Sequence, residues 1–243
     1  IFSYDAYPFI TIGTMKTGVH EILWEMPQFL HERERENGIP YAVFLQAGGL
    51  WEGDIRTRIP TIGEVKLGIS IPLLYGAKCL QIFPYMFPND WQDDKVAFAG
   101  IVDANGNKTK FFDYYKQAFR QVGAIGGYLL KANIKGVIKN GEYSNGLPTK
   151  EEIKKIQWSD CVYQGELPEC GNIEISPQKP LLNVESKTQA LIGVLSVDGV
   201  DAYFAVNNSS TEENEITCAF DGVYNFEIIC DGVTKEKQGD KIT

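Results

Sequence analysis

The sequence predicts an α/β fold, with three βα units of a (β/α)8 TIM barrel followed by a small antiparallel β-sandwich. Three observations support this prediction. Short apolar strand patterns alternate with longer helical patterns up to about residue 130. The segments after these strands are long and rich in Tyr, Trp, Asp and Arg, as expected for a barrel whose site lies at the carboxyl ends of its strands. Beyond residue 130, short alternating strands are separated by Gly, Asn and Asp turns.

The first half of the chain contains three apolar segments with the pattern of strands: residues 1–9, Tyr41–Gln46 and Cys79–Tyr85. The first of them opens into a loop at Tyr7-Pro8. A helical pattern follows each of them: about Gly18–Asn37, 60–78 and 111–130. The first helix has apolar residues on one face and the charged run "HERERE" on the other, so this run is interpreted as a solvated helix face. Apolar strands that alternate with helices are typical of a parallel sheet covered on both faces.

A glycine-rich loop is expected between the second strand and the helix that begins at Pro60. Its aromatic and charged residues are Trp51, Glu52, Asp54, Arg56 and Arg58. The favoured interpretation of the two arginines is pairing with the two acids of the same loop, with capture of a ligand carboxylate as the alternative.

Two motifs are interpreted as local structure. In "PTIGE", Thr61 occupies the N-cap position and Glu64 follows three residues later, which predicts a capping box. In "DANG", Asp103 begins a run of turn-forming residues, so a turn is favoured over a functional role.

Three βα units cannot close a barrel of eight strands. The missing part of the barrel is therefore expected upstream or on another chain. The predicted division places a partial barrel at residues 1–132 and a β-sandwich domain at residues 133–243.

Composition argues against several classes of protein. The 243 residues carry a formal charge of -9, whereas a nucleic-acid partner would call for clustered Lys and Arg. No apolar run reaches the roughly 18 residues that span a bilayer. The first residues lack the pattern of a signal peptide.

Cysteine and histidine usage predicts neither a metal nor a cofactor. The five cysteines have irregular spacing and no Cys-x-x-Cys motif. Cys161 and Cys170 flank a Gly/Pro turn and are the favoured pair if one disulfide forms. Because the chain has only His20 and His31, a Ser-His-Asp triad is not expected.

Polar and aromatic side chains lie at or just after the ends of the three expected strands: Asp5 and Tyr7, then Gln46 and Trp51, then Tyr85 and Trp91. The carboxyl ends of parallel strands meet at one edge, so these residues are candidates to bind a polar ligand. Aromatic faces suit the C–H faces of sugars. Each residue also has a local alternative. Asp5 could cap the loop, Tyr7 could form a rigid turn with Pro8, and the Gln46 amide could bond strand-end backbone groups.

Glu52 is the candidate catalytic residue. Glycoside hydrolysis uses two carboxyl groups roughly 5 to 10 Å apart, and burial of a loop acid beside Trp51 would raise its pKa. The simpler interpretation is a solvated loop acid. Gln46, at the strand tip, can neither titrate nor act as a nucleophile, because its side chain is an amide.

Four segments together resemble a known family: "YDAYPF", "FLQAGG" with the later "R.PT..E", "YGAKCLQIFPY" and "GIVDANGNKTKFFDYYKQ". They resemble the last three βα units, strands 6 to 8, of clan-A-type (β/α)8 glycoside hydrolases. The style is that of the family 42 β-galactosidases of carbohydrate-degrading bacteria. The resemblance covers residues 1–130, and a small β-sandwich commonly follows the barrel in that group.

The resemblance implies retaining hydrolysis of a β-linked oligo- or polysaccharide by two glutamates, one after the fourth strand and one at the end of the seventh. The fourth strand is absent from this sequence, and the nucleophile position falls at or near Gln46. One hypothesis is therefore a glycoside hydrolase in which this chain supplies part of the active-site wall. The alternative is a non-catalytic carbohydrate-binding protein on a degenerate barrel. A polysaccharide substrate would suit a secreted or cell-surface protein.

A third interpretation is a non-sugar α/β protein in which the strand-end aromatic residues serve packing alone.

Overall fold

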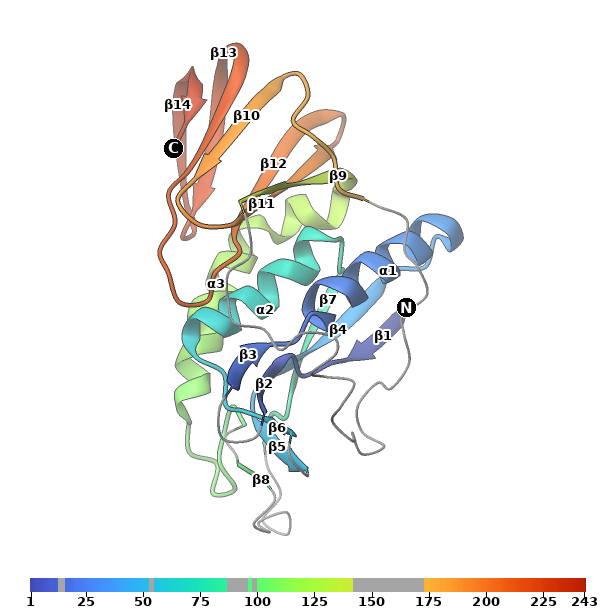
Figure 1. The fold of residues 1–243 in the computed structure, drawn as a ribbon, viewed down its shortest axis with the longest axis vertical. Helices are drawn as coiled ribbons and strands as arrows, with labels where there is room; N and C mark the ends of the chain where they lie inside the picture. Colours follow the sequence, from blue (N-terminus) through green and yellow to red (C-terminus); the bar gives the residue numbers. More distant parts are fainter. Residues whose placement is uncertain (13–15, 53–54, 87–95, 98–99, 142–172) are drawn as a thin grey trace.

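The computed structural model of the chain describes residues 1–12, 16–52, 55–86, 96–97, 100–141 and 173–243. These residues form fourteen strands, arranged in four sheets, and three helices. In Figure 1 the helices occupy the middle of the molecule, with two antiparallel sheets at one end and a small five-stranded sheet at the other.

A three-stranded parallel sheet is built from the apolar strands of the first half. Its strands are β1 (Phe2–Asp5), β4 (Tyr41–Gln46) and β7 (Cys79–Phe83), in the order β1-β4-β7. The predicted bounds of β4 are confirmed, and β7 ends two residues before the predicted Tyr85. Since β4 lies between the other two strands, their carboxyl ends come together at one edge of this sheet.

A second sheet lies beyond the carboxyl ends of β1 and β4, in the lower part of Figure 1. Its five strands are β2 (Phe9–Ile12), β3 (Lys16–Val19), β5 (Gly49–Glu52), β6 (Ile55–Thr57) and β8 (Val96–Ala97). They pair in the order β3-β2-β6-β5-β8, and every pairing is antiparallel.

Each of the three helices has an end that its sequence explains. The helices are α1 (Ile22–Asn37), α2 (Ile62–Leu74) and α3 (Lys110–Lys131). Gly38 ends α1 in the left-handed conformation, with φ of 66°, as the glycine pattern predicts. Thr61 and Glu64 form the predicted capping box at the start of α2, and Thr109 caps α3. The predicted start of α1 near Gly18 is wrong, because that residue pairs in β3.

Helix α2 is the centre of the hydrophobic core. It buries Val65, Leu67, Ile69, Ile71 and Leu74, which point to several sides of the helix. A helix that is apolar nearly all round is stable only when other elements cover it. Here β4 and α3 cover one side, and strands from the second half of the chain cover another.

The second half contains two three-stranded antiparallel sheets. One has the order β12-β11-β9, formed by Val200–Asn207, Ala190–Val197 and Asn133–Asn140. The other has the order β10-β13-β14, formed by Leu181–Ser186, Ile216–Cys230 and Val233–Ile242. A cluster of buried residues joins them, with Ile192 and Val194 on the first sheet and Leu181, Val184 and Phe220 on the second.

The first of these sheets lies directly on α2. Gly193 of β11 has no room for a side chain, because an ideal Cβ would stand 2.9 Å from Cδ1 of Leu74. Ile134 of β9 and Leu195 of β11 belong to the same buried cluster as Val65 of α2. Residues on both sides of the predicted boundary at 132 and 133 therefore share one core.

The predicted fold class, an α/β fold with three βα units of a (β/α)8 barrel, is wrong. Three of the four sheets among the described residues are antiparallel, and the parallel sheet has only three strands. The error has a local cause. The segments around 10–19 and 49–57 are too short and too rich in glycine to show a strand period, so the sequence predicts no strands there. Their backbones instead pair with one another to make the five-stranded sheet.

None of the helices in the described ranges is long and apolar enough to cross a membrane.

Candidate functional site

The carboxyl edge of the parallel sheet brings together side chains from β1 and β7. Asp5 ends β1 and Tyr7 follows it, while Phe83 ends β7 and Tyr85 follows it. The rings of Tyr7 and Phe83 stack, with 6.0 Å between centroids and 24° between planes. We call Asp5, Tyr7, Phe83 and Tyr85 the carboxyl-edge cluster.

Asp5 and Tyr7 influence each other electrostatically. Burial and the nearby Asp5 carboxylate raise the pKa of the Tyr7 phenol well above its ordinary value. Burial raises the pKa of Asp5, and the Tyr7 hydroxyl acts in the opposite direction. The Tyr7 hydroxyl is nevertheless buried without a hydrogen bond of good geometry. The Asp5 carboxylate is the polar group that acts on this hydroxyl, and the hydroxyl itself is shielded from solvent.

The β7 side of the cluster presents aromatic surface to solvent. Tyr85 is 63% exposed and Phe83 is 38% exposed, and Met86 beside them is also exposed. The backbone under Tyr85 is anchored, because its carbonyl accepts a hydrogen bond from the Val102 N–H at 3.0 Å. An exposed ring on an anchored backbone can contact the C–H face of a flat ligand at low entropic cost.

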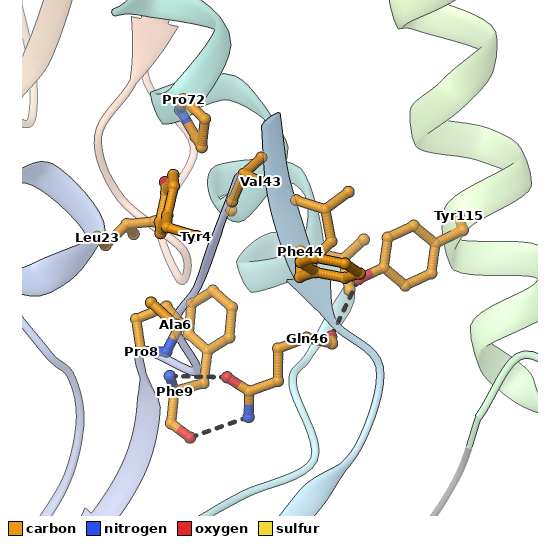
Figure 2. A pocket seen from close by; sticks show the side chains of 13 residues that line it. Tyr4, Ala6, Pro8, Phe9, Leu23, Val43, Phe44, Gln46, Pro72 and Tyr115 are labelled. Carbon is orange, nitrogen blue, oxygen red and sulfur yellow. Dashed lines mark hydrogen bonds between the residues drawn. The ribbon is translucent and has the colours of Figure 1, made fainter. Parts of the chain in front are cut away.

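Gln46 lies at the tip of β4 but does not point its amide at a ligand. The residue is 4% exposed, and Figure 2 shows its side chain turned toward Phe9. Gln46 Oε1 accepts from the Phe9 N–H at 3.1 Å, and Nε2 donates to the carbonyls of Phe9 (3.2 Å), Gly48 (3.0 Å) and Arg58 (2.8 Å). Its backbone carbonyl accepts from the Tyr115 hydroxyl at 3.0 Å. Backbone carbonyls bind the amide hydrogens of Gln46. The residue therefore satisfies backbone groups at the strand end, which was the alternative to a ligand-binding role.

Arg58 pairs with Glu64, and not with the acids of its own loop. Its guanidinium donates to both carboxylate oxygens of Glu64, one of them at 2.6 Å from Nη1. The two side chains are 19% and 5% exposed, so the pair is largely buried. Glu64 also accepts from the Thr61 N–H at 2.9 Å. The expected pairing of Arg58 within its own loop is therefore wrong, and its donors are not free to clamp a ligand carboxylate.

The cavity in Figure 2 lies behind Gln46, between the parallel sheet and α2. Its volume is about 20 Å³, and Tyr4, Phe9, Leu23, Val43 and Pro72 are among its lining residues. A space of this size holds about one water molecule. A sugar ring cannot enter it.

The remaining predicted site residues are only partly placed. The backbones of Trp51 and Glu52 belong to β5, at the edge of a hairpin with β6, and not to a loop. Their side chains, together with Asp54, Trp91 and the Cys161–Cys170 pair, lie outside what the structure describes. The catalytic role of Glu52 therefore stays a prediction. Asp103 forms the predicted turn, accepting from the N–H groups of Asn105 and Asn107.

Phe83 belongs to the carboxyl-edge cluster but was not among the predicted site residues. Its apolar side chain at a strand end gave no polar signal, and only its distance from Tyr7 identifies its role. No group of three or more His, Cys, Asp or Glu side chains in the described ranges could hold a metal ion. Cys79, Cys218 and Cys230 are free thiols.

Comparison with protein-family models and with curated proteins finds no match to this chain.

Proposed function

We propose that the protein binds carbohydrate at the carboxyl-edge cluster. The observation that carries this proposal is the exposed aromatic surface of Phe83 and Tyr85, together with Asp5, whose carboxylate acts on the Tyr7 side chain that stacks on Phe83. A sugar hydroxyl can donate a hydrogen bond to the exposed Asp5 carboxylate. Phe83 and Tyr85 supply aromatic surface next to these polar groups, and this combination suits a saccharide.

Glycoside hydrolysis is the second candidate function. It is favoured by Asp5, a carboxyl group at the end of β1 whose pKa is raised by burial, because a raised pKa suits general-acid catalysis. A hydrolase needs a second carboxyl group across the scissile bond, and Glu52 is the residue proposed for that role. The Gln46 amide, held by four backbone groups, cannot supply it.

Titration calorimetry against β-linked tetrasaccharides tests the binding proposal. Tyr7→Phe removes the hydroxyl that acts on the Asp5 carboxylate and should weaken binding through Asp5 about 3- to 10-fold, the worth of one hydrogen bond. Tyr85→Ala should weaken it by a similar factor through loss of ring contact. Tyr128→Phe is the matched control and should keep the wild-type affinity, because Tyr128 is an exposed tyrosine on α3 that bonds Glu227 of β13. Wild-type affinity in both Tyr7→Phe and Tyr85→Ala, or no sugar binding at all, would exclude this site.

Release of an aryl leaving group from aryl β-glycosides separates the two candidates. Turnover that is lost in both Asp5→Asn and Glu52→Gln, with sugar binding retained, would support hydrolysis. Binding without turnover on the whole panel would support the non-catalytic alternative.

We also propose a partner polypeptide beside the parallel sheet. Among the described strands, β1 and β7 each pair with β4 alone, and Ile1 and Phe2 at the β1 edge are exposed. Strands of parallel sheets are normally covered. Native mass spectrometry of the purified protein should show a complex heavier than one 27.2 kDa chain; a single species of that mass at micromolar concentration would contradict the proposal.

A further inference from the structure

The turn that begins at Asp103 carries an Asn-Gly dipeptide at its tip, Asn105-Gly106. Both residues are exposed. Gly106 has φ of 82°, and open space surrounds the position that a side chain would take. Asparagine is among the chemically labile side chains, and a following glycine leaves its own backbone nitrogen open to attack on the asparagine side chain. The proposed carbohydrate site does not use this dipeptide.

Three Asn-Gly dipeptides lie in the ranges that the structure describes: residues 37–38, 105–106 and 140–141. They differ in how the asparagine side chain is held. Among the described residues, none hydrogen-bonds to the side chain of Asn105, whose backbone N–H alone donates, to the Asp103 carboxylate at 2.9 Å. The Asn105 side chain is therefore free to turn toward the Gly106 nitrogen.

The other two side chains are held. Asn37 donates to the Arg33 carbonyl at 2.9 Å in the last turn of α1. Asn140, at the end of β9, hydrogen-bonds to Ser186 Oγ at 2.7 Å. Each must first break that hydrogen bond before its Cγ can meet the glycine nitrogen.

The glycine nitrogens do not explain a difference between the first two dipeptides. The Gly38 N–H donates to the Glu34 carbonyl at 2.8 Å, and the Gly106 N–H donates to the Asp103 carbonyl at 3.0 Å. Both hydrogen bonds must open before reaction. The side-chain hydrogen bond is then the remaining difference, and it favours reaction at Asn105.

We propose that Asn105 is a modification site, at which the folded protein converts asparagine to aspartate and isoaspartate without an enzyme. The Gly106 nitrogen bonds to Cγ of Asn105 and loses its proton, and the side-chain nitrogen leaves as ammonia. Water then opens the cyclic imide, and the ring nitrogen takes back a proton. Cleavage of the bond to Cγ gives aspartate. Cleavage of the main-chain bond gives isoaspartate, in which the main chain runs through the former side chain.

Isoaspartate at this position should loosen the backbone that holds Tyr85. The Asp103 carboxylate accepts from the N–H groups of both Asn105 and Asn107, and the Asp103 N–H donates to the Asn107 carbonyl at 2.9 Å. The next residue back, Val102, donates to the Tyr85 carbonyl at 3.0 Å. An extra main-chain carbon inside so short a turn should strain these hydrogen bonds.

Peptide mapping of the wild-type protein, held folded in mildly alkaline buffer for increasing times, measures the rate at each dipeptide. Chromatography separates the aspartyl and isoaspartyl peptides, and tandem mass spectrometry assigns the residue. Conversion at Asn105 should be at least about fivefold faster than at Asn37 or Asn140, the factor that one hydrogen bond is worth. In denaturant the three rates should become similar. Equal rates in the folded protein, or a faster reaction at Asn37 or Asn140, would overturn the proposal.

Hydrogen exchange then measures the effect on the turn. The Val102 N–H should exchange at least about fivefold faster in isoaspartate-containing protein than in fresh protein. Asn105→Gln is the matched control, because its longer side chain closes a ring far more slowly; after the same incubation it should exchange at the rate of fresh protein. An unchanged Val102 rate in the isoaspartyl form would overturn the loosening of the Tyr85 backbone.

Discussion

Gln46 and Phe9 are joined by a reciprocal pair of hydrogen bonds across 37 residues of sequence. The Phe9 N–H donates to Gln46 Oε1 at 3.1 Å, and Gln46 Nε2 donates back to the Phe9 carbonyl at 3.2 Å (Figure 2). Through this pair the tip of β4 holds the first residue of β2. The same amide also bonds the carbonyls of Gly48 and Arg58, so one side chain connects the parallel sheet with the five-stranded sheet.

Gln46→Glu is expected to destabilise the protein by about 3 kcal/mol. The change replaces the amide nitrogen, which faces three backbone carbonyls, with an acceptor oxygen in a buried place. Chemical denaturation monitored by circular dichroism measures the change in the free energy of unfolding. Gln117→Glu, at an exposed position of α3, is the control and should change it by less than about 0.5 kcal/mol. A Gln46→Glu variant as stable as the wild type would show that the amide network contributes little.

Gln46 also shows what sequence reasoning could and could not predict about the site. Its position at the tip of β4 was predicted correctly, because the apolar run stops there. Its hydrogen-bond partners could not be predicted, since Phe9 and Arg58 are brought to it by the pairing of β2 with β6, and no local pattern reveals that pairing. Motifs that close within a few residues, such as the capping box of Thr61 and Glu64, were predicted correctly.

The prediction of the fold class was wrong for a related reason. Strand pairing among short segments depends on partners distant in sequence, and no local period reveals it. Trp51 of β5 pairs with Arg56 of β6, and β6 in turn pairs with Thr11 of β2. Of the site, Asp5, Tyr7 and Tyr85 could be chosen as strand-end residues, whereas the Tyr7–Phe83 stacking required the tertiary structure.

Breaking the Arg58–Glu64 pair should cost far more than breaking a surface pair. Glu64→Gln leaves the Arg58 guanidinium largely buried without its counter-charge, and the expected loss is about 3 kcal/mol in the free energy of unfolding. The control is Arg33→Ala, which removes an exposed pair with Glu36 and should cost about 0 to 1 kcal/mol.

Thr61→Ala separates the two roles of Glu64. This change removes the N-cap hydroxyl and leaves the ion pair, so about 1 kcal/mol is expected. Equal losses in Glu64→Gln and Thr61→Ala would mean that capping, and not the ion pair, accounts for the contribution of Glu64.

A buried amide network joins α1 to the second half of the chain. Trp24 Nε1 donates to Asn208 Oδ1 at 2.9 Å, Asn208 donates to Gln189, and Gln189 donates to the Gly141 carbonyl at 3.0 Å. Asn208→Ala should lower the free energy of unfolding by about 2 kcal/mol, because it leaves buried donors and acceptors unpaired. Denaturation measures it, with Asn225→Ala on the exposed part of β13 as the control.

A double-mutant cycle checks that this loss comes from the network. Trp24→Phe and Asn208→Ala should be non-additive by at least about 0.5 kcal/mol, since each removes the same hydrogen bond. Additive losses would show that Trp24 and Asn208 stabilise the protein independently.

His31 should make the stability of the protein depend on pH near neutrality. The residue is 6% exposed and its Nδ1 is buried without a hydrogen bond. Burial, followed by the charges of Arg35 and Lys78, lowers its pKa below the ordinary value of 6.5. The unfolded chain therefore takes up the proton first as the pH falls. Stability is full above about pH 6.5 and decreases as the pH drops below it, by at most about 1.4 kcal/mol per pH unit, until His31 titrates in the folded state.

Denaturation of the wild type and of His31→Gln between pH 7.5 and 5.5 measures this dependence. Glutamine keeps a donor for the hydrogen bond to the Tyr75 backbone but does not titrate, so its curve should be flatter over that range. His20 is the other histidine of the chain, and its Nδ1 accepts from the Ile22 N–H. His20→Asn retains an acceptor for the Ile22 N–H, and its stability should keep the pH dependence that His31 causes. Parallel curves for the wild type and His31→Gln would assign the pH dependence to groups other than His31.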